Sequence, residues 1–250
     1  MFLKILKYQK KSNGTYLVKL EDQNFILYEE VILKYQLLFK KEILESELEK
    51  IEKDNYEWQC YYDAIRSLKN RVKSISDMKD FLLKKDYPDP LVSITLGKLE
   101  KQGFLNDSSF VSSYIHNQMI TSNKGPLKIA NDLIYIHHVD SNIVSSSLSL
   151  YDEELEKQKI NKNIERMIHM NKNKGGGVLK NKITKELIAL GYHDFLITSL
   201  LSEYTFSVSR DMIEKEKEKL YRKYQKKYEG KVLEQKIKEG LYKKGLYKED

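Results

Sequence analysis

Cysteine and proline are both scarce in this sequence of 250 residues, which holds one cysteine, three prolines and eleven glycines. A single cysteine cannot form an internal disulfide, so we expect a reducing compartment such as the cytoplasm. Cys60 follows Trp58 in an apolar series, which favours a core thiol over a nucleophile. Few prolines and glycines favour helices over sheets or disorder. Long apolar runs are missing too, which predicts neither a signal peptide nor a membrane span.

Motifs for catalysis and metal binding are also missing from the sequence. The five histidines form no H-x-x-x-H pattern, and the serines at 145–147 have no G-x-S-x-G context. The glycines at 175–177 follow Lys174 but lack the Gly-Lys-Ser/Thr of a phosphate loop. We interpret this segment as a flexible joint between two helices, whose backbone N–H groups could still meet an anion. We therefore expect no catalytic residue, no metal and no cofactor.

Positive charge is concentrated in the C-terminal part of the chain. Residues 155–250 carry 23 Lys/Arg and 14 Asp/Glu, a net charge of +9. Residues 1–154 carry 21 and 23, a net charge of −2, and within them residues 109–154 have a net charge of −3. This asymmetry predicts an acidic or nucleic-acid partner for the C-terminal part.

The first 55 residues differ from the rest in having three short β-prone runs, at 5–9, 16–20 and 25–28. Ser12-Asn13-Gly14 between the first two is typical of a hairpin turn. We predict a three-stranded antiparallel sheet, which an edge pairing elsewhere could extend. Residues 31–39 and 41–54 then have the apolar spacing of helices.

In the remaining chain a helical pattern recurs four times, starting at positions 78, 129, 183 and 237. Each copy has an apolar residue, a second one four positions later, a turn residue at +8 and a large side chain at +9. The copies are Met78-Leu82-Asp86-Tyr87, Ile129-Leu133-His137-His138, Ile183-Leu187-Gly191-Tyr192 and Ile237-Leu241-Gly245-Leu246. In the second copy Val139 suits the last position better than His138. The expected residues before or at each helix start are Ser76, Gly125, Gly177 and Gly230.

A recurrence of about fifty residues predicts tandem repeats of three short helices each. The fold class is therefore mainly α, with a small N-terminal antiparallel β segment and a truncated C-terminal repeat. The predicted boundaries are an extension at 1–55, repeats at 56–107, 108–154 and 155–208, and a basic truncated repeat at 209–250.

Residues 102–133 are expected to contain the end of one helix, the whole of a second helix and the start of a third helix. Gly103 suits a helix C-terminus, and residues 106–108 suit the cap of a helix that begins near Phe110. Gly125-Pro126 ends that helix and opens the next. The residues expected to carry this structural signature are Gly103, Phe104, Leu105, Asp107, Phe110, Gly125, Pro126, Ile129 and Leu133.

This signature resembles that of the RecX family, bacterial regulators of the RecA recombinase. The resemblance covers about residues 56–250, and the N-terminal sheet is similar to the extension of longer members. His116 and Gln118 stand where arginines are common in the family.

The resemblance implies three tandem three-helix repeats in an elongated, curved array. It implies a monomer that binds RecA and its filament on single-stranded DNA in the cytoplasm, with no membrane association. Such a protein modulates, and mostly inhibits, the recombinase, ATPase and co-protease activities of RecA in DNA repair and the SOS response.

The candidate contacts to DNA phosphates or to the filament are lysines and an arginine that flank the two glycine turns or follow Tyr221 at helical spacing. They are Lys124, Lys128, Lys172, Lys174, Lys180, Lys182, Arg222, Lys223, Lys226 and Lys227. Two alternatives stay open: a stand-alone basic helical repeat that binds nucleic acid, and a protein-only scaffold whose lysines serve solubility.

Overall fold

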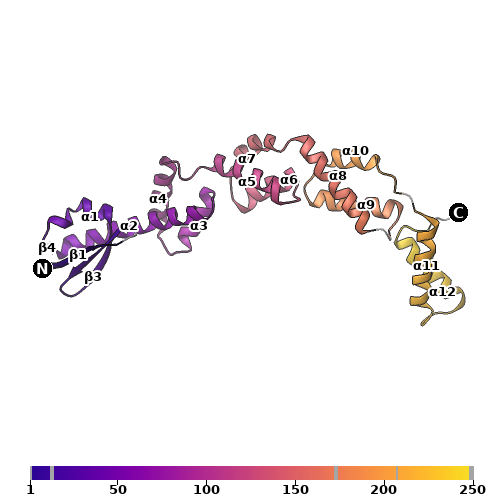
Figure 1. The fold of residues 1–250 in the computed structure, drawn as a ribbon, viewed down its shortest axis with the longest axis horizontal. Helices are drawn as coiled ribbons and strands as arrows, with labels where there is room; N and C mark the ends of the chain where they lie inside the picture. The colour runs from indigo at the N-terminus through magenta and orange to yellow at the C-terminus, as the bar shows by residue number, and fades with distance from the viewer. Residues whose placement is uncertain (1, 12–13, 172–173, 207, 248–250) are drawn as a thin grey trace. The chain divides into compact units, whose positions relative to one another are not determined.

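The computed structural model describes residues 2–11, 14–171, 174–206 and 208–247. Most of these residues are helical, and one antiparallel sheet lies at the N-terminal end (Figure 1). The predicted fold class is confirmed in this respect. The chain forms two compact units, residues 1–110 with 137–139 and residues 111–136 with 140–250.

The N-terminal sheet has four strands in the order β3-β2-β1-β4, and each neighbouring pair is antiparallel. Residues 12 and 13 of the predicted hairpin turn lie outside the described residues. Gly14, the last residue of that turn, has φ +76°. The bounds are β1 (Phe2–Lys10), β2 (Thr15–Leu20), β3 (Asn24–Tyr28) and β4 (Glu42–Leu44).

The fourth strand corrects the predicted helix at 41–54. Phe2, Leu3 and Lys4 of β1 pair with β4, and only then does helix α2 (Glu45–Asn70) begin. Within β4 the side chain of Ile43 is buried while its two neighbours are exposed, which is the period of two of a strand. The pairing that we expected to extend the three-stranded sheet at its edge is made by β4.

Two helices pack on the sheet, α1 (Glu29–Lys34) and α2, as Figure 1 shows. The predicted helix at 31–39 is wrong beyond Lys34, because Gln36 takes a left-handed φ of 51° and a 3₁₀ turn follows at Leu37–Phe39. The shared core consists of Val18, Leu20, Leu27, Val31, Ile32, Leu37, Ile43, Leu48 and Ile51.

Helix α2 closes the outer edge of this sheet with one side chain. The N–H of Tyr28 donates to Oδ1 of Asn55 at 2.9 Å, and Nδ2 of Asn55 donates to the carbonyl of Ile26 at 3.0 Å. Asn55 thus occupies backbone groups of β3 that an added strand would need. The same helix continues through residues 55 and 56, where we predicted a domain boundary.

The remaining helices follow the predicted order of the repeats. After α2 they are α3 (Ile75–Leu83), α4 (Asp89–Lys101), α5 (Asp107–Thr121), α6 (Pro126–Asn131), the π-helix η2 (Asp132–Ile136), α7 (Ser141–Ser147), the 3₁₀ helix η3 (Leu148–Leu150), α8 (Glu153–Met170), α9 (Gly176–Ala189), α10 (Asp194–Ser202), α11 (Arg210–Tyr224) and α12 (Gly230–Lys243). The domain boundaries and the curved array stay predictions.

The apolar series of the repeats form separate cores. Met78, Leu82 and Tyr87 lie in one buried cluster with Cys60, whose thiol pKa is raised by burial. The later series form clusters in α8–α10 and in α11–α12. Cys60 is therefore a core thiol, as expected.

The second repeat departs from the common spacing by one residue. The left-handed turn residue lies eight positions after the first apolar residue in three copies, with φ values of 62° at Asp86, 84° at Gly191 and 68° at Gly245. In the second copy it is His138, nine positions after Ile129, and Val139 is the buried residue that follows. Our assignment of the turn to His137 is wrong, and the better fit of Val139 is confirmed. The extra residue lies in η2, because a π-helical turn closes over one residue more than an α-helical turn.

The helix starts are confirmed at Gly125 and Gly230 and shifted at the other two. The N-cap of α3 is Ser74 rather than Ser76, and that of α9 is Gly175 rather than Gly177. Within the described parts of the chain, none of the helices is long and apolar enough to cross a membrane.

Candidate nucleic-acid interface

At the glycine turns next to the candidate lysines, the backbones of successive repeats contact each other. The N–H of Gly125 donates to the carbonyl of Leu190 at 2.7 Å, and that of Leu127 donates to the carbonyl of Gly191 at 3.0 Å. A Cβ on Gly125 would lie 2.4 Å from the carbonyl oxygen of Gly191. Only residues without a side chain allow this approach, so the lysines around the turn have a fixed backbone beneath them.

The next junction has the same form. The N–H of Gly175 donates to the carbonyl of Lys244 at 3.0 Å, and a Cβ on Gly245 would lie 2.5 Å from the carbonyl oxygen of Gly175. Gly175 is buried, so our interpretation of a flexible joint is wrong at this residue. Its N–H is also taken and does not serve an anion.

In the compact unit that holds α3, a side chain replaces the glycine contact. The hydroxyl of Ser74 donates to the carbonyl of His137 at 2.9 Å, and Nδ1 of His137 lies 2.8 Å from Oδ2 of Asp77. His137 is therefore a buried residue held by Ser74 and Asp77, and the turn itself is formed by His138. Among the described residues, no three metal-ligating side chains form a group that could hold a metal ion.

The signature residues of this region mostly serve the fold. Leu105, Phe110, Ile129 and Leu133 are buried, whereas the Phe104 side chain is 54% exposed. Gly103, with φ +74°, follows Gln102, the C-cap of α4, and Pro126 is the first residue of α6. Asn106 caps α5 through the N–H of Ser109, while Oδ1 of Asp107 accepts from the N–H of Ile75.

The two lysines at the first glycine turn differ in their surroundings. The ammonium of Lys124 lies 2.6 Å from Oδ2 of the buried Asp132, and this hydrogen bond raises its pKa. Lys128 is exposed on α6. Lys124 is therefore engaged inside the protein, and Lys128 is the better placed of the two to meet a partner.

The lysines near α9 lie at its start and on its surface. Lys180 and Lys182 are exposed, and Nζ of Lys182 donates to Oδ1 of Asn171 at 2.7 Å. Lys174 is half-buried and borders an open pocket beside Gly175. Lys172 lies outside the described residues.

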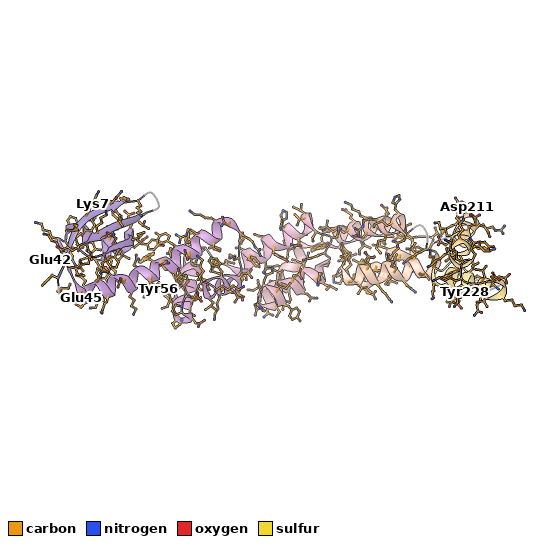
Figure 2. The ribbon with its side chains drawn as sticks, turned by 90° about the horizontal axis from the view of Figure 1, so that it is seen from below. Lys7, Glu42, Glu45, Tyr56, Asp211 and Tyr228 are labelled. Carbon is orange, nitrogen blue, oxygen red and sulfur yellow. The ribbon has the colours of Figure 1, made fainter. Side chains whose placement is uncertain are left out.

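The four C-terminal candidates gather at one end of the α11–α12 hairpin. Arg222 and Lys223 are in the last turn of α11, but the helix ends at Tyr224, so Lys226 and Lys227 lie in the turn that follows. The predicted helical spacing is wrong for these last two residues. Figure 2 shows this end, where Tyr228 is labelled, and Asp211 at the opposite end of α11.

All four of these cations are exposed, and their contacts are weak. The guanidinium of Arg222 lies 3.6 Å from the carboxylate of Glu218, and both side chains are exposed. An ion pair of this kind contributes little to stability. The Lys223 ammonium lies 5.3 Å from the centre of the Tyr224 ring. The group can therefore meet phosphates without first breaking a buried ion pair.

A further group of cations, in the first repeat, was not among the predicted contacts. Arg66, Arg71, Lys73 and Lys85 line one open pocket between α2 and α3. They are spread over residues 66–85, which carry seven Lys/Arg and two Asp/Glu, but the acidic residues on either side bring residues 56–108 to a net charge of only +1. A charge count over the whole repeat therefore does not mark them. Their proximity comes from the packing of α3 on α2.

No protein-family model matches the chain. The chain is nevertheless similar over most of its length to proteins named regulatory protein RecX. It is 28% identical over 233 residues to the protein of Listeria monocytogenes serotype 4a, with 91% of this chain and 86% of the relative covered. It is 29% identical over 243 residues to the protein of Streptococcus sanguinis, with 94% and 91% covered.

Two solved structures have a similar fold. A crystal structure of regulatory protein RecX matches with a TM-score of 0.68 at 21% identity, over 80% of this chain and 99% of the other. That of RecX from Lactobacillus salivarius matches with a TM-score of 0.55 at 25% identity, over 59% and 95%.

Proposed function

Because this chain belongs to the RecX family, we propose that it is a non-enzymatic regulator of the RecA recombinase. In this proposal it binds RecA and its filament on single-stranded DNA, and mostly inhibits strand exchange, ATP turnover and co-protease activity. The observation that carries the proposal is the similarity to proteins named regulatory protein RecX along more than nine tenths of the chain.

The exposed cations give this function a physical basis. Lys128, Lys180 and the group at 222–227 point to contact with phosphates, which requires positive charge but no fixed side-chain geometry. The chain has only five arginines, the residue type that best reads base edges in pairs of hydrogen bonds. Binding without regard to sequence suits a regulator that must act anywhere on a filament.

The second repeat supplies a complementary surface charge. Residues 109–154 have a net charge of −3, next to a C-terminal part with a net charge of +9. An acidic segment favours contact with basic protein surface, while a basic segment favours nucleic acid. A filament of RecA on DNA presents both kinds of partner.

The test is RecA-catalysed ATP hydrolysis on oligo(dT), with this protein added at ratios well below one copy per RecA. Loss of most of the turnover at such ratios is expected, because one bound copy affects many subunits of a filament. Unchanged turnover at excess, with equal affinity for naked oligo(dT) and for the filament, would replace the proposal by a stand-alone nucleic-acid-binding repeat. No binding to oligo(dT) or to the filament at low salt would leave a protein-only scaffold.

A further inference from the structure

An open pocket of about 370 Å³ lies in the first repeat, which holds none of the candidate lysines. One wall comes from α2, and the rest comes from the segment after it, from α3 and from the turn that follows α3. Its lining consists of Asp63, Arg66, Ser67, Asn70, Arg71, Lys73, Phe81 and Lys85. The volume falls in the range of about 300–1,000 Å³ that is typical of small-ligand sites.

The charge of this lining is strongly positive. Four cations face one carboxylate, that of Asp63, so the pocket has a net charge of +3. Both carboxylate oxygens of Asp63 already have partners inside the protein. The carboxylate pairs with Arg66, accepts from Nζ of Lys85 at 2.6 Å and accepts from the hydroxyl of Tyr87 at 3.0 Å. Like charges repel, so a cluster of this kind is stabilised when an anion enters it.

Two of the four cations have no such internal role. Arg71 follows the last residue of α2 and is exposed, and Lys73 is half-buried beside Phe81. Within the described part of the chain, neither has a carboxylate partner. A guanidinium offers paired donors that match a phosphate group, and an ammonium adds a point charge. Ser67 and Asn70 add uncharged hydrogen-bonding groups to the same wall.

The aromatic residue of the pocket limits what kind of contact forms. The ammonium groups of Lys73 and Lys85 lie 5.1 Å and 5.4 Å from the centre of the Phe81 ring. These cations place positive charge beside the ring, which favours a phosphate as the group that the pocket binds. Recognition of this kind has no base preference.

We propose that this pocket binds a backbone phosphate of single-stranded DNA, with Arg71 and Lys73 as its main contacts. This proposal rests on the proposed function, because that function identifies the strand as the single-stranded DNA that RecA coats. The contact would lie in the first repeat, where the net charge of residues 56–108 is only +1. DNA contact would then involve both compact units and not the basic C-terminal part alone.

The test compares two double variants of the full chain in binding to fluorescent oligo(dT) over a range of salt concentrations. Arg71→Gln with Lys73→Gln removes the two pocket cations. Lys69→Gln with Lys84→Gln removes the same charge from exposed positions of the same repeat that do not line the pocket. Chemical unfolding of each variant checks that the fold is retained.

The pocket variant should bind roughly tenfold more weakly at low salt. Its slope of log K against log salt should become shallower by about 0.7, since one phosphate contact on a single strand contributes about that much. The control should keep the slope of the wild type. Equal losses in both variants would overturn the pocket, since only diffuse charge would then matter.

Two further measurements separate a strand phosphate from a free nucleotide as the ligand, and separate the pocket proposal from the proposed function. Free dTMP that binds the wild type as tightly as the oligonucleotide does would assign the pocket to a free nucleotide and overturn the strand contact. A wild type that inhibits RecA turnover while both variants bind oligo(dT) alike would overturn the pocket and leave the proposed function intact. A loss of binding confined to the pocket variant, with RecA turnover unaffected by the wild type, would support the pocket and contradict the proposed function.

Discussion

At Gly191 the backbone adopts a left-handed φ of 84° and at the same time contacts another repeat. A Cβ at this position would lie 2.3 Å from the backbone nitrogen of Lys128. His138 occupies the corresponding turn of the second repeat with φ 49°. There the contact is a hydrogen bond from the hydroxyl of Ser74 to the carbonyl of His137, and the turn residue itself carries a side chain.

Gly191→Ala should therefore destabilise the protein by about 1–3 kcal/mol from backbone strain alone, with the clash against Lys128 in addition. Gly97→Ala is the control, because Gly97 lies within α4 and has no atom within 4 Å of an added Cβ. That control should leave stability unchanged or raise it by up to about 1 kcal/mol. Urea unfolding monitored by circular dichroism measures both, and equal effects would contradict the junction.

Asp63 links stability to pH through its buried carboxylate. Burial by itself would raise its pKa, but hydrogen bonds from Lys85, Arg66 and Tyr87 outweigh burial and hold the pKa below the ordinary value of 3.8. Because the folded-state pKa is the lower one, the stabilisation is present above pH 3.8 and is lost as the pH falls below it.

Asp63→Asn should cost about 1–2 kcal/mol at neutral pH and should flatten the loss of stability between pH 5 and pH 2. Both cationic partners are partly exposed and stay solvated, which keeps the cost moderate. The control is Asp80→Asn, at an exposed position of α3. Chemical unfolding as a function of pH gives the answer, and an unchanged acid profile would contradict the role of Asp63.

At the scale of elements, the π-helix η2 explains why one repeat is longer by a residue. It inserts that residue between Leu133 and the turn at His138, so that Val139 still reaches the core. Tyr135 and Ile136 of η2 are exposed, with 71% and 62% of their surface accessible. The insertion is thus accommodated on the outside of the helix.

Deletion of Tyr135 should convert η2 into an ordinary helical turn and restore the spacing of the other repeats. We expect the free energy of unfolding to change by less than about 1 kcal/mol, because the buried residues on both sides keep their positions. Deletion of Asp80 in α3 is the matched control: it turns all later residues by about 100° and removes Leu82 and Tyr87 from their core. That loss should cost about 3 kcal/mol or more. Similar losses in the two deletion variants would refute the insertion.

The elements themselves were predictable to different degrees. Helices with a buried stripe, such as Met78-Leu82 and Ile183-Leu187, were recognisable because the stripe repeats within one segment. Strand β4 was not, because three residues next to a long helix carry too little pattern of their own. Its strand geometry depends on pairing with Phe2–Lys4, some forty positions away.

At the scale of the whole molecule, charge is the property that most directly concerns the proposed function. The group at 222–227 contributes four exposed cations at one end of the C-terminal hairpin. The N-terminal sheet also exposes lysines, including Lys7, which is labelled on the sheet in Figure 2. That part of the chain, however, is balanced by acidic residues to a net charge of zero over residues 1–55.

Reversal of Arg222, Lys223, Lys226 and Lys227 to glutamate should weaken binding to the RecA filament and flatten its salt dependence. If all four cations contact phosphates, the slope of log K against log salt should fall by about 3. Four exposed lysines of the sheet region, reversed in the same way, provide the control: Lys4, Lys7, Lys19 and Lys41. Equal effects of the two sets would mean that total charge, and not the C-terminal group, governs binding. Circular dichroism of each variant checks that helix content is retained.

The sequence by itself determined the mainly helical fold, the order of the repeated helices, their buried series and the uneven charge, because each of these is a property of residues close together in the chain. Only the tertiary structure decided the pairing of β4 and the one-residue insertion of η2. It also decided the backbone contact of Gly125 with Gly191 and the gathering of Arg71 and Lys73 with Lys85 around one pocket. These features arise where segments far apart in sequence pack against each other, and no local pattern records which segments will meet.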